Sequence, residues 1–572
     1  MPALRALYFS LTLFFVFLAP SAHCETKWNI SGGSKQLTEN ISQHLAGIGD
    51  IDTLNALQQD KLIEKTVIGA ARALGYYNLK LHWQKKNDSI QIALTPGEPV
   101  VWLTPNLSIF GSGFDEVALV GMLEKHPFQE GSSINQSEYD SFKAGLLNKA
   151  RSLGYRDAKY LIHRLTIDIE NNVAIAQLQM DTGTAYTVGE ISFSGTRLSP
   201  SRLSKMLPIK TGVRYRSALL SKFYSALLDS GYFNRIEIKT VDRENQQIDI
   251  QVQLEDAPKH AYTTGIGFST DTGPRIRLGW DRAAINEKGH RWSNELQASE
   301  FEQTFRSEYR IPKGDPINDY VSVNFGWKER SVEDTDHQIL ETSVARSKLN
   351  TATGWRRTYQ LSLEKEDYVQ GNQSENVVFY AIPGVSWSKT FTKGGAKAPT
   401  SGYKYWLNLE GSSEYIGSDT DFIRVSGGLK WLVPLATNHE TLFKLEGGSI
   451  AAQEFTLVPS SRRFFAGGDQ SIRGFGYQTI APTDDTGELE GGQNLFAASV
   501  EYRYRWLENW QIALFTDVGD AFNSNVFKLR KGAGFGLHWM SPIGAIRFDV
   551  AKPIDDDDYQ SVRLHISMGP TL

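Results

Sequence analysis

The feature that most constrains this fold is a change of periodicity near Tyr262. Up to that residue, apolar positions recur at helical and at strand spacings in turn, and after it the helical spacing disappears. Segments of about 9–11 residues with alternating polar and apolar side chains follow, as in membrane barrels, separated by Gly, Asn, Asp and Lys. A period of two residues is typical of strands with one apolar and one polar face. Residues 260–572 are therefore predicted to be all-β.

The last alternating segments separate charged side chains from apolar ones. In residues 545–550, Ile546 and Phe548 share the apolar face, while Arg547 and Asp549 point the other way. The same separation recurs in residues 499–506, 510–518 and 562–568. An apolar face toward lipid and an ionic lumen explain the pattern, whereas a soluble sandwich with so many outward aromatics would aggregate. At about 19 residues per strand and connection, the length of the segment allows about 16 antiparallel strands in a transmembrane barrel, an estimate from length and not from each strand.

Three repeats precede the barrel, and each has a Gly-Tyr pair after an amphipathic helix pattern. The pairs begin at Gly75, Gly154 and Gly231, spaced 79 and 77 residues apart. Glycine suits the end of a helix because it tolerates a positive φ. A strand, a polar turn and an alternating strand follow each pair, which indicates separate α+β domains rather than a solenoid, whose repeats are shorter. These three domains are predicted at residues 25–98, 99–184 and 185–259.

Residues 1–24 have the pattern of a secretory signal peptide. Arg5 supplies positive charge, and residues 6–18 form an apolar run of 13 residues, which is too short to span a membrane. Ala22-His23-Cys24 fits a cleavage site, and lipid attachment at Cys24 is the alternative. Cys24 is the one cysteine, so we expect no disulfide framework. Since no later run reaches about 18 apolar residues, we expect no helical membrane anchor.

A glycine-rich segment between the alternating strands carries the most specific motif. Residues 462–477 read Arg-Arg-Phe-Phe-Ala-Gly-Gly-Asp-Gln-Ser-Ile-Arg-Gly-Phe-Gly-Tyr, which is too rich in glycine for a strand. Its glycines and aromatics suit a loop folded into a barrel lumen, where the arginine needs a buried carboxylate. An ordinary glycine-rich hairpin loop is the alternative. The predicted motif residues are Gly467, Gly468, Ile472, Arg473, Gly474 and Phe475.

Two carboxylates on predicted lumen faces are candidate partners of Arg473. They are Asp517, in residues 510–518, and Glu501, in residues 499–506. A bidentate arginine–carboxylate contact would fix the geometry of the loop more than it would add stability, because desolvation offsets the attraction. The alternative is that both are ordinary lumen charges with local partners.

The motif in residues 467–475 resembles the Ile/Val-Arg-Gly-Phe/Tyr loop of the outer-membrane assembly and secretion superfamily that includes BamA, TamA and FhaC. Phe515-Thr516-Asp517-Val518-Gly519 resembles the aromatic-x-Asp-x-Gly strand of this superfamily, in which the aspartate meets the loop arginine. The three repeats resemble its polypeptide-transport-associated (POTRA) domains. BamA has five such repeats and FhaC-type pores have two, so three repeats before a barrel resemble the TamA branch.

The resemblance implies a barrel in the outer membrane with its N-terminal domains in the periplasm. It also implies a translocation and assembly function for β-barrel clients such as autotransporters, together with a TamB-like periplasm-spanning inner-membrane partner. A two-partner-type secretion pore and a lipid-transport conduit are the alternatives within the same superfamily. A general porin would need no periplasmic repeats.

The first and last predicted strands contain residues that weaken strand pairing. Gly265 and Gly267 lie in the first strand, and glycine weakens a strand interior. Gly569 and Pro570 lie at the end of the last strand, and proline cannot donate a ladder hydrogen bond. We predict a weak seam between the two strands, with an unpaired edge that templates a client strand by β-augmentation.

We expect no enzymatic activity and no cofactor. No Ser-His-Asp, zinc-binding or phosphate-loop pattern is visible in the sequence. The run 555–558 consists of four aspartates and permits a divalent cation, although a solvated outer turn is favoured. A net charge of −5 argues against a nucleic-acid partner, which would favour a basic excess.

Overall fold

The computed structural model describes residues 27–48, 51, 54–86, 89–371, 374–394, 399–523, 526–541, 544–554 and 561–569. The predicted signal peptide with Cys24, the aspartate run 555–558 and Pro570 lie outside the described residues. The chain forms two compact units, each described here by itself. The first comprises Met1–Gly189, Gly212–Ala218 and Asp242–Ile248, and the second comprises Glu190–Thr211, Leu219–Val241 and Asp249–Leu572.

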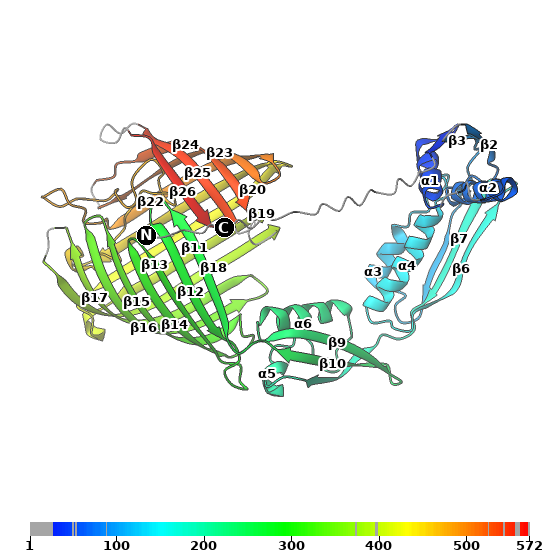
Figure 1. The fold of residues 1–572 in the computed structure, drawn as a ribbon. Helices are drawn as coiled ribbons and strands as arrows, with labels where there is room; N and C mark the ends of the chain where they lie inside the picture. The colour runs from blue at the N-terminus through cyan, green and yellow to red at the C-terminus, as the bar shows by residue number, and fades with distance from the viewer. Residues whose placement is uncertain are drawn as a thin grey trace, which may run out of the picture. The chain divides into compact units, whose positions relative to one another are not determined.

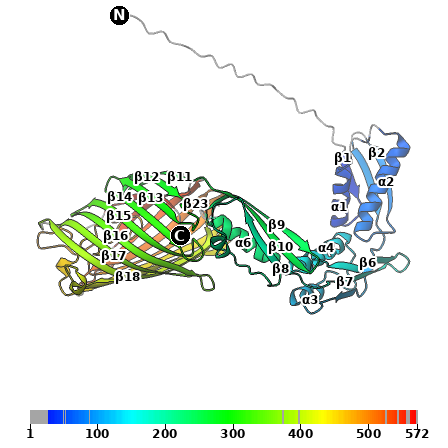
Figure 2. The ribbon, with the colours of Figure 1, turned by 90° about the horizontal axis from the view of Figure 1, so that it is seen from below.

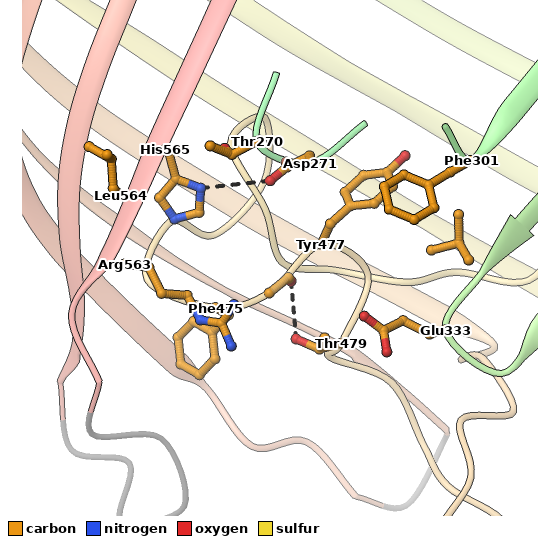
Figure 3. A pocket seen from close by; sticks show the side chains of 12 residues that line it. Thr270, Asp271, Phe301, Glu333, Phe475, Tyr477, Thr479, Arg563, Leu564 and His565 are labelled. Atoms are coloured by element: carbon orange, nitrogen blue, oxygen red, sulfur yellow. Dashed lines mark hydrogen bonds and ion pairs between the residues drawn. The ribbon is translucent and has the colours of Figure 1, made fainter. Parts of the chain in front are cut away.

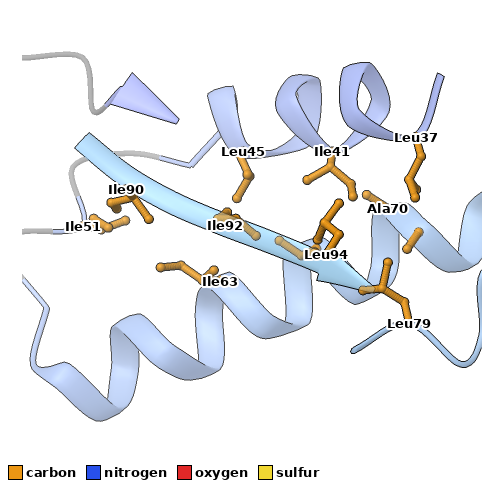
Figure 4. Packing of buried hydrophobic residues seen from close by; sticks show 12 residues of the cluster. Leu37, Ile41, Leu45, Ile51, Ile63, Ala70, Leu79, Ile90, Ile92 and Leu94 are labelled. Atoms are coloured by element: carbon orange, nitrogen blue, oxygen red, sulfur yellow. The ribbon is translucent and has the colours of Figure 1, made fainter. Parts of the chain in front are cut away.

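The first small domain packs two helices on a three-stranded sheet. Its elements are β1 (Lys27–Ser31), α1 (Lys35–Ala46), α2 (Ala56–Ala73), β2 (Lys80–Lys86) and β3 (Ser89–Thr95). The central β3 pairs parallel to β1 and antiparallel to β2. Figure 4 shows Ile41 of α1 and Ile63 of α2 directed toward Ile92 of β3, all within one buried cluster. The apolar positions of the helix pattern and of the strand pattern therefore form a single core.

The second and third small domains repeat this plan of helices beside a sheet. The second contains β4 (Val101–Trp102), β5 (Asn106–Phe110), α3 (Val117–Glu124), α4 (Gln136–Ser152), β6 (Lys159–Asp168) and β7 (Val173–Asp181). The third contains β8 (Thr187–Ser194), α5 (Pro200–Ser204), α6 (Ser217–Asp229), β9 (Phe233–Arg243) and β10 (Gln247–Asp256), in the sheet order β8-β10-β9. In both domains, a hairpin with a polar turn follows the longer helix, as the repeats predict.

The glycine of each Gly-Tyr pair has a positive φ: +89° at Gly75, +103° at Gly154 and +66° at Gly231. The first two glycines also hold the chain that enters the next domain. The Gly75 carbonyl accepts from Val100 N–H at 2.9 Å, and the Gly154 carbonyl accepts from Tyr186 N–H at 2.8 Å. These glycines therefore serve close backbone approach as well as helix termination, and the sequence argument recognised only the second role.

The remaining strands close into one barrel (Figures 1 and 2). In the described residues it has sixteen strands, each antiparallel to the next, which confirms the predicted fold. They are β11 (Ala261–Ser269), β12 (Gly273–Arg282), β13 (Arg291–Ser299), β14 (Glu302–Pro312), β15 (Asp319–Val332), β16 (Thr335–Asn350), β17 (Trp355–Gln370), β18 (Asn376–Gly394), β19 (Pro399–Ser412), β20 (Phe422–Ala436), β21 (His439–Ala452), β22 (Asn494–Leu507), β23 (Trp510–Phe522), β24 (Arg530–Ser541), β25 (Gly544–Ile554) and β26 (Arg563–Gly569).

Strand length changes around the barrel, and here the sequence expectation was partly wrong. Near the closure, β11 and β13 have 9 residues each and β12 has 10, as expected. In the opposite wall, β17 has 16 residues and β18 has 19, well beyond the expected length. Because about 9–11 tilted residues suffice to cross a bilayer, the longer strands continue past it.

The two faces of the barrel wall differ as the alternation predicts. On β23 and β25, Leu514 and Phe548 are exposed on the outer face, while Asp517 and Asp549 are buried on the lumen side. An apolar outer face and an ionic lumen are the arrangement of a transmembrane barrel. As for helices, none in the described residues is both long enough and apolar enough to cross a bilayer.

Within the second unit, residues of the third small domain form hydrogen bonds with two connections between barrel strands. Arg202 is buried and donates to the carbonyl oxygens of Pro312 and Gly314, in the turn between β14 and β15. Tyr232, the tyrosine of the third Gly-Tyr pair, donates its hydroxyl to the Gly289 carbonyl between β12 and β13. The domain is thereby joined to strands near the start of the barrel.

We expect Gly154→Ala to destabilise the small domains more than Gly212→Ala. Both residues have a positive φ, so alanine costs about 1–2 kcal/mol at either site. A Cβ at residue 154 would also overlap the Tyr215 carbonyl oxygen, which adds about 1–3 kcal/mol, whereas a Cβ at residue 212 meets nothing within 4 Å. Denaturant unfolding followed by helical circular dichroism measures the difference. Equal losses would contradict a role of Gly154 in close approach.

Candidate functional site

The segment between β21 and β22, residues 453–493, folds back into the barrel. Ile472 and Phe475 are fully buried and pack in one cluster with Tyr380, Phe422 and Ile450 of the barrel wall. Two isolated bridges, Phe464 with Gly492 and Ala466 with Ile480, hold the segment in a compact form. We call this segment the lumen loop. It occupies the position that its glycines and aromatics predict.

Arg473 lies at the centre of the contacts between the lumen loop and the wall, with a side chain that is 2% exposed. Its Nε donates to Asp517 Oδ2 at 2.8 Å and its Nη2 donates to Asp517 Oδ1 at 3.0 Å, which makes a bidentate pair. Its Nη1 donates to Glu501 Oε2 at 2.6 Å. The structure thus brings Arg473 together with both predicted partners, from β22 and β23.

A third carboxylate joins this cluster, and sequence reasoning did not assign it to Arg473. Asp549 of β25 accepts from Arg473 Nη1 at 3.0 Å and contacts His538 Nε2 at 2.8 Å. The alternation had placed Asp549 on the lumen face, but its distance from Arg473 depends on cross-strand register, which one strand does not reveal. The Phe515 ring centre lies 3.4 Å from the guanidinium carbon of Arg473. Three strands and a ring therefore fix the guanidinium.

Each charged side chain of this cluster has an oppositely charged partner within the lumen. Burial opposes the charge of Arg473, but Asp517 and Glu501 hold its pKa well above the ordinary value, so the side chain stays a cation. Glu501 also accepts from Arg503 Nε at 2.5 Å. Such a buried network is costly to break, because removal of one member leaves the others without partners. In the described residues, no group of three or more His, Cys, Asp or Glu could hold a metal.

The motif glycines allow the loop backbone to approach its neighbours. Gly467, Gly468 and Gly474 have φ values of +103°, +97° and +98°, which favour glycine. A Cβ at residue 467 would overlap the Gly476 carbonyl oxygen, and one at residue 474 would lie 3.0 Å from the Lys552 carbonyl carbon. A side chain at either position would push the loop away from its contacts.

Two further arginines hold the start of the loop, Arg462 through the barrel wall and Arg463 through the backbone of the loop itself, whereas the sequence pattern predicted a role for Arg473 alone. Arg462 pairs with Glu364 of β17 and with Glu410 of β19. Arg463 donates to the backbone carbonyls of Val458, Glu490 and Thr456. The two adjacent arginines are visible in the sequence, but their partners are not. The partners of Arg462 lie 52 or more residues away along the chain, and those of Arg463 are backbone carbonyls. The loop is therefore held from both walls of the barrel.

The closure between β11 and β26 is much shorter than the other strand junctions. Among the residues that the structure describes, one residue pair, Ser269 with Ser567, is in register, and Thr270 N–H donates to the Ile566 carbonyl at 3.0 Å. On their other sides, β11 pairs with β12 from Ala261 to Ser269, and β26 pairs with β25 from Arg563 to Gly569.

The predicted seam glycines lie where this ladder stops. Two residues along each strand from the Ser269–Ser567 pair, Gly267 would face Gly569, and the described residues show no pairing there. Gly265 lies two residues further along β11, while Pro570 lies outside the described residues. Both Gly265 and Gly267 remain fully paired to β12. The gap therefore lies on one side of β11 and is not a general weakness of that strand.

Comparisons with known families match most of the chain. A model of the Omp85 superfamily domain matches residues 244–571. A POTRA model described as surface antigen variable number repeat matches residues 186–256, and a model of TamA POTRA domain 1 matches residues 27–96. The barrel and two of the small domains are thus each matched by a model.

The curated relatives include outer membrane protein assembly factors named BamA. That of Nitratidesulfovibrio vulgaris is 24% identical over 390 residues, covering 63% of this chain and 48% of the relative. That of Neisseria meningitidis serogroup B is 20% identical over 576 residues, covering 87% and 71%. The chain therefore spans about half the length of the first relative. The crystal structure of Haemophilus ducreyi BamA lacking POTRA domains 1–3 has the same fold, with a TM-score of 0.69 at 17% identity, covering 82% of this chain and 99% of that one.

We expect Arg473→Ala to lower the temperature at which the barrel loses its folded mobility in detergent gels. The substitution leaves the buried Asp517 without its guanidinium partner and removes one partner each from Glu501 and Asp549, which costs about 3–5 kcal/mol in comparable networks. Asp517→Ala should act in the same direction, and the double variant should lose less than the sum of the two. Arg505→Ala, an arginine of the same wall outside the Arg473 contacts, is the control. Full additivity, or a variant as heat-resistant as the parent, would contradict the anchoring role.

Proposed function

Because this chain belongs to the Omp85 superfamily, we propose that it assembles or secretes β-barrel clients through the seam between β11 and β26. The barrel lies in the outer membrane and its N-terminal POTRA domains lie in the periplasm. The observation that carries the proposal is the closure itself: within the described part of the chain, which ends at residue 569, β11 and β26 share one residue pair while their other edges are paired along their length.

An edge of this kind has the chemistry to accept another strand. Backbone N–H and C=O groups without partners are costly in lipid, and they template the pairing of an incoming strand. The outward side chains of β11 include Ile266, which is 82% exposed, and Tyr262, so the edge is bordered by apolar surface. A client hairpin can therefore add to β11 by β-augmentation and remain in contact with the bilayer.

The Arg473 cluster gives the seam one rigid side. It ties the lumen loop to β22, β23 and β25, the last of which is the neighbour of β26. We assign the predicted motif residues this supporting role. A fixed wall on one side lets the other side yield without the barrel losing its shape.

We further assign the chain to the TamA branch of the superfamily, with a TamB-like periplasm-spanning inner-membrane partner and clients such as autotransporters. The match of TamA POTRA domain 1 to residues 27–96 supports this assignment, as do the three helix-and-sheet domains before the barrel. The curated relatives carry the name BamA, which supports the assembly function in general. A secretion pore and a lipid conduit are the competing functions that the experiment below separates.

A photo-crosslinking amino acid at Gly267, activated in cells, is expected to give adducts with nascent outer-membrane barrel strands. Gly267 lies on the edge that β26 leaves unpaired. The matched control places the same probe at Gly326, a glycine of β15 paired on both sides, with Arg306 and with Glu341. Adducts at Gly267 and none at Gly326 would identify the seam as the client site.

Efficient crosslinking from other sites combined with a clean absence at Gly267 would overturn insertion through the seam. Adducts with a single exported substrate would favour the secretion pore, and adducts confined to lipid would favour the conduit.

A further inference from the structure

The lumen loop contacts both edges of the seam. On the β11 side, Asp469 N–H donates to Asp271 Oδ2 at 2.6 Å, and Ser269 Oγ donates to Asp469 Oδ2 at 3.1 Å. On the β26 side, Gly474 N–H donates to His565 Nε2 at 3.0 Å. Six residues of one loop, Asp469–Gly474, thus join the end of β11 and the turn that follows it to β26.

We propose that the Asp469–Gly474 segment of the lumen loop is a latch that holds β11 and β26 together where their own ladder is too short to do so. Asp469, Asp271 and His565 are its positioning residues. The further idea that a client enters when the latch is released rests on the proposed function. The latch itself does not rest on it.

The latch lies where the described residues of the two strands pair. Ser269 is both the paired residue of the ladder and the donor to Asp469. His565 lies two residues before Ser567, and its Nδ1 is 3.8 Å from Asp271 Oδ1, a contact seen in Figure 3. Ser269, Asp271 and His565 are all buried. Loop contacts and ladder contacts therefore form one group of bonds, which must open together.

Two carboxyl groups meet in this latch, so it is held less firmly than a salt bridge. Burial and the neighbouring Asp271 carboxylate raise the pKa of Asp469 to about 6. Lys444 of β21 opposes the shift, and Lys430 of β20 and Arg547 of β25 also face this carboxyl group. Because the pKa in the folded protein lies above the ordinary value, protonation below about pH 6 strengthens the latch, and ionisation above it weakens the latch.

A cavity beside the latch gives the loop room to move. It has a volume of about 480 Å³. Figure 3 shows that Asp271 and His565 line it together with Phe475, Tyr477 and Thr479 of the loop. Tyr477 and Thr479 of the loop and Asp271 and His565 of the latch border this space, whereas Ile472 and Arg473 are packed against the wall.

The test is hydrogen–deuterium exchange of the purified full chain in lipid nanodiscs, without any client. Asp469→Ala removes the bond from Ser269 and is expected to speed exchange in peptides of residues 261–270 and 563–569 by roughly two- to tenfold, the factor for one modest hydrogen bond. Asp469→Asn keeps an acceptor for Ser269, adds a donor toward Asp271 and removes the repulsion, so exchange there should be equal to the parent or slower. Asp485→Ala, an exposed carboxylate of the same loop, is the control and should change neither peptide.

Unchanged exchange at both strands in Asp469→Ala would overturn the latch. Equal acceleration by Asp469→Asn and Asp469→Ala would overturn the carboxyl contact as its basis. Because no client is present, either result is independent of crosslinking at Gly267. A latch without client adducts would leave this inference standing and remove the proposed function, and the converse pair of results would do the opposite.

Discussion

The architecture depends on one buried cation. The side chain of Arg473 is 2% exposed, too little for water to solvate its charge, so the loop is stable in the lumen only where carboxylates from the wall meet it. Those carboxylates come from β22, β23 and β25, and they converge only when the strands from β22 to β25 have paired in the correct register. The loop position and the wall geometry therefore determine each other. Among these carboxylates, Asp517 makes the most hydrogen bonds to Arg473, because it accepts from both the guanidinium and the backbone N–H.

The closure reflects a conflict between two requirements of a membrane barrel. Every backbone group in the hydrocarbon region needs a partner, yet a client strand can enter only where partners are missing. In this chain the gap is confined to one edge of β11, next to the strands whose lengths match a single crossing of the bilayer. The loop contacts at Ser269 and His565, both buried, add bonds between the two strands from inside the lumen.

Alternation along single strands was sufficient to predict the barrel, its two faces and the carboxylates that point into the lumen. Asp517 was selected for Arg473 by the resemblance of residues 515–519 to the aromatic-x-Asp-x-Gly strand of the superfamily, and Glu501 by its matching position on the neighbouring strand. What it could not supply was register between strands, on which the contacts of Asp549 and Arg462 depend. The unusual length of β18 was missed because nothing in a local pattern marks where a strand leaves the bilayer.

The attachment of the third small domain bears on how motion reaches the membrane. The hydrogen bond from Arg202 ends at the connection between β14 and β15, and that from Tyr232 ends at the connection between β12 and β13. β12 and β13 are the two strands that follow β11 directly. A tilt of that domain would therefore displace the strands from β12 to β15. Any force on the domain in the periplasm would be transmitted to the β11 side of the seam without direct contact with the bilayer.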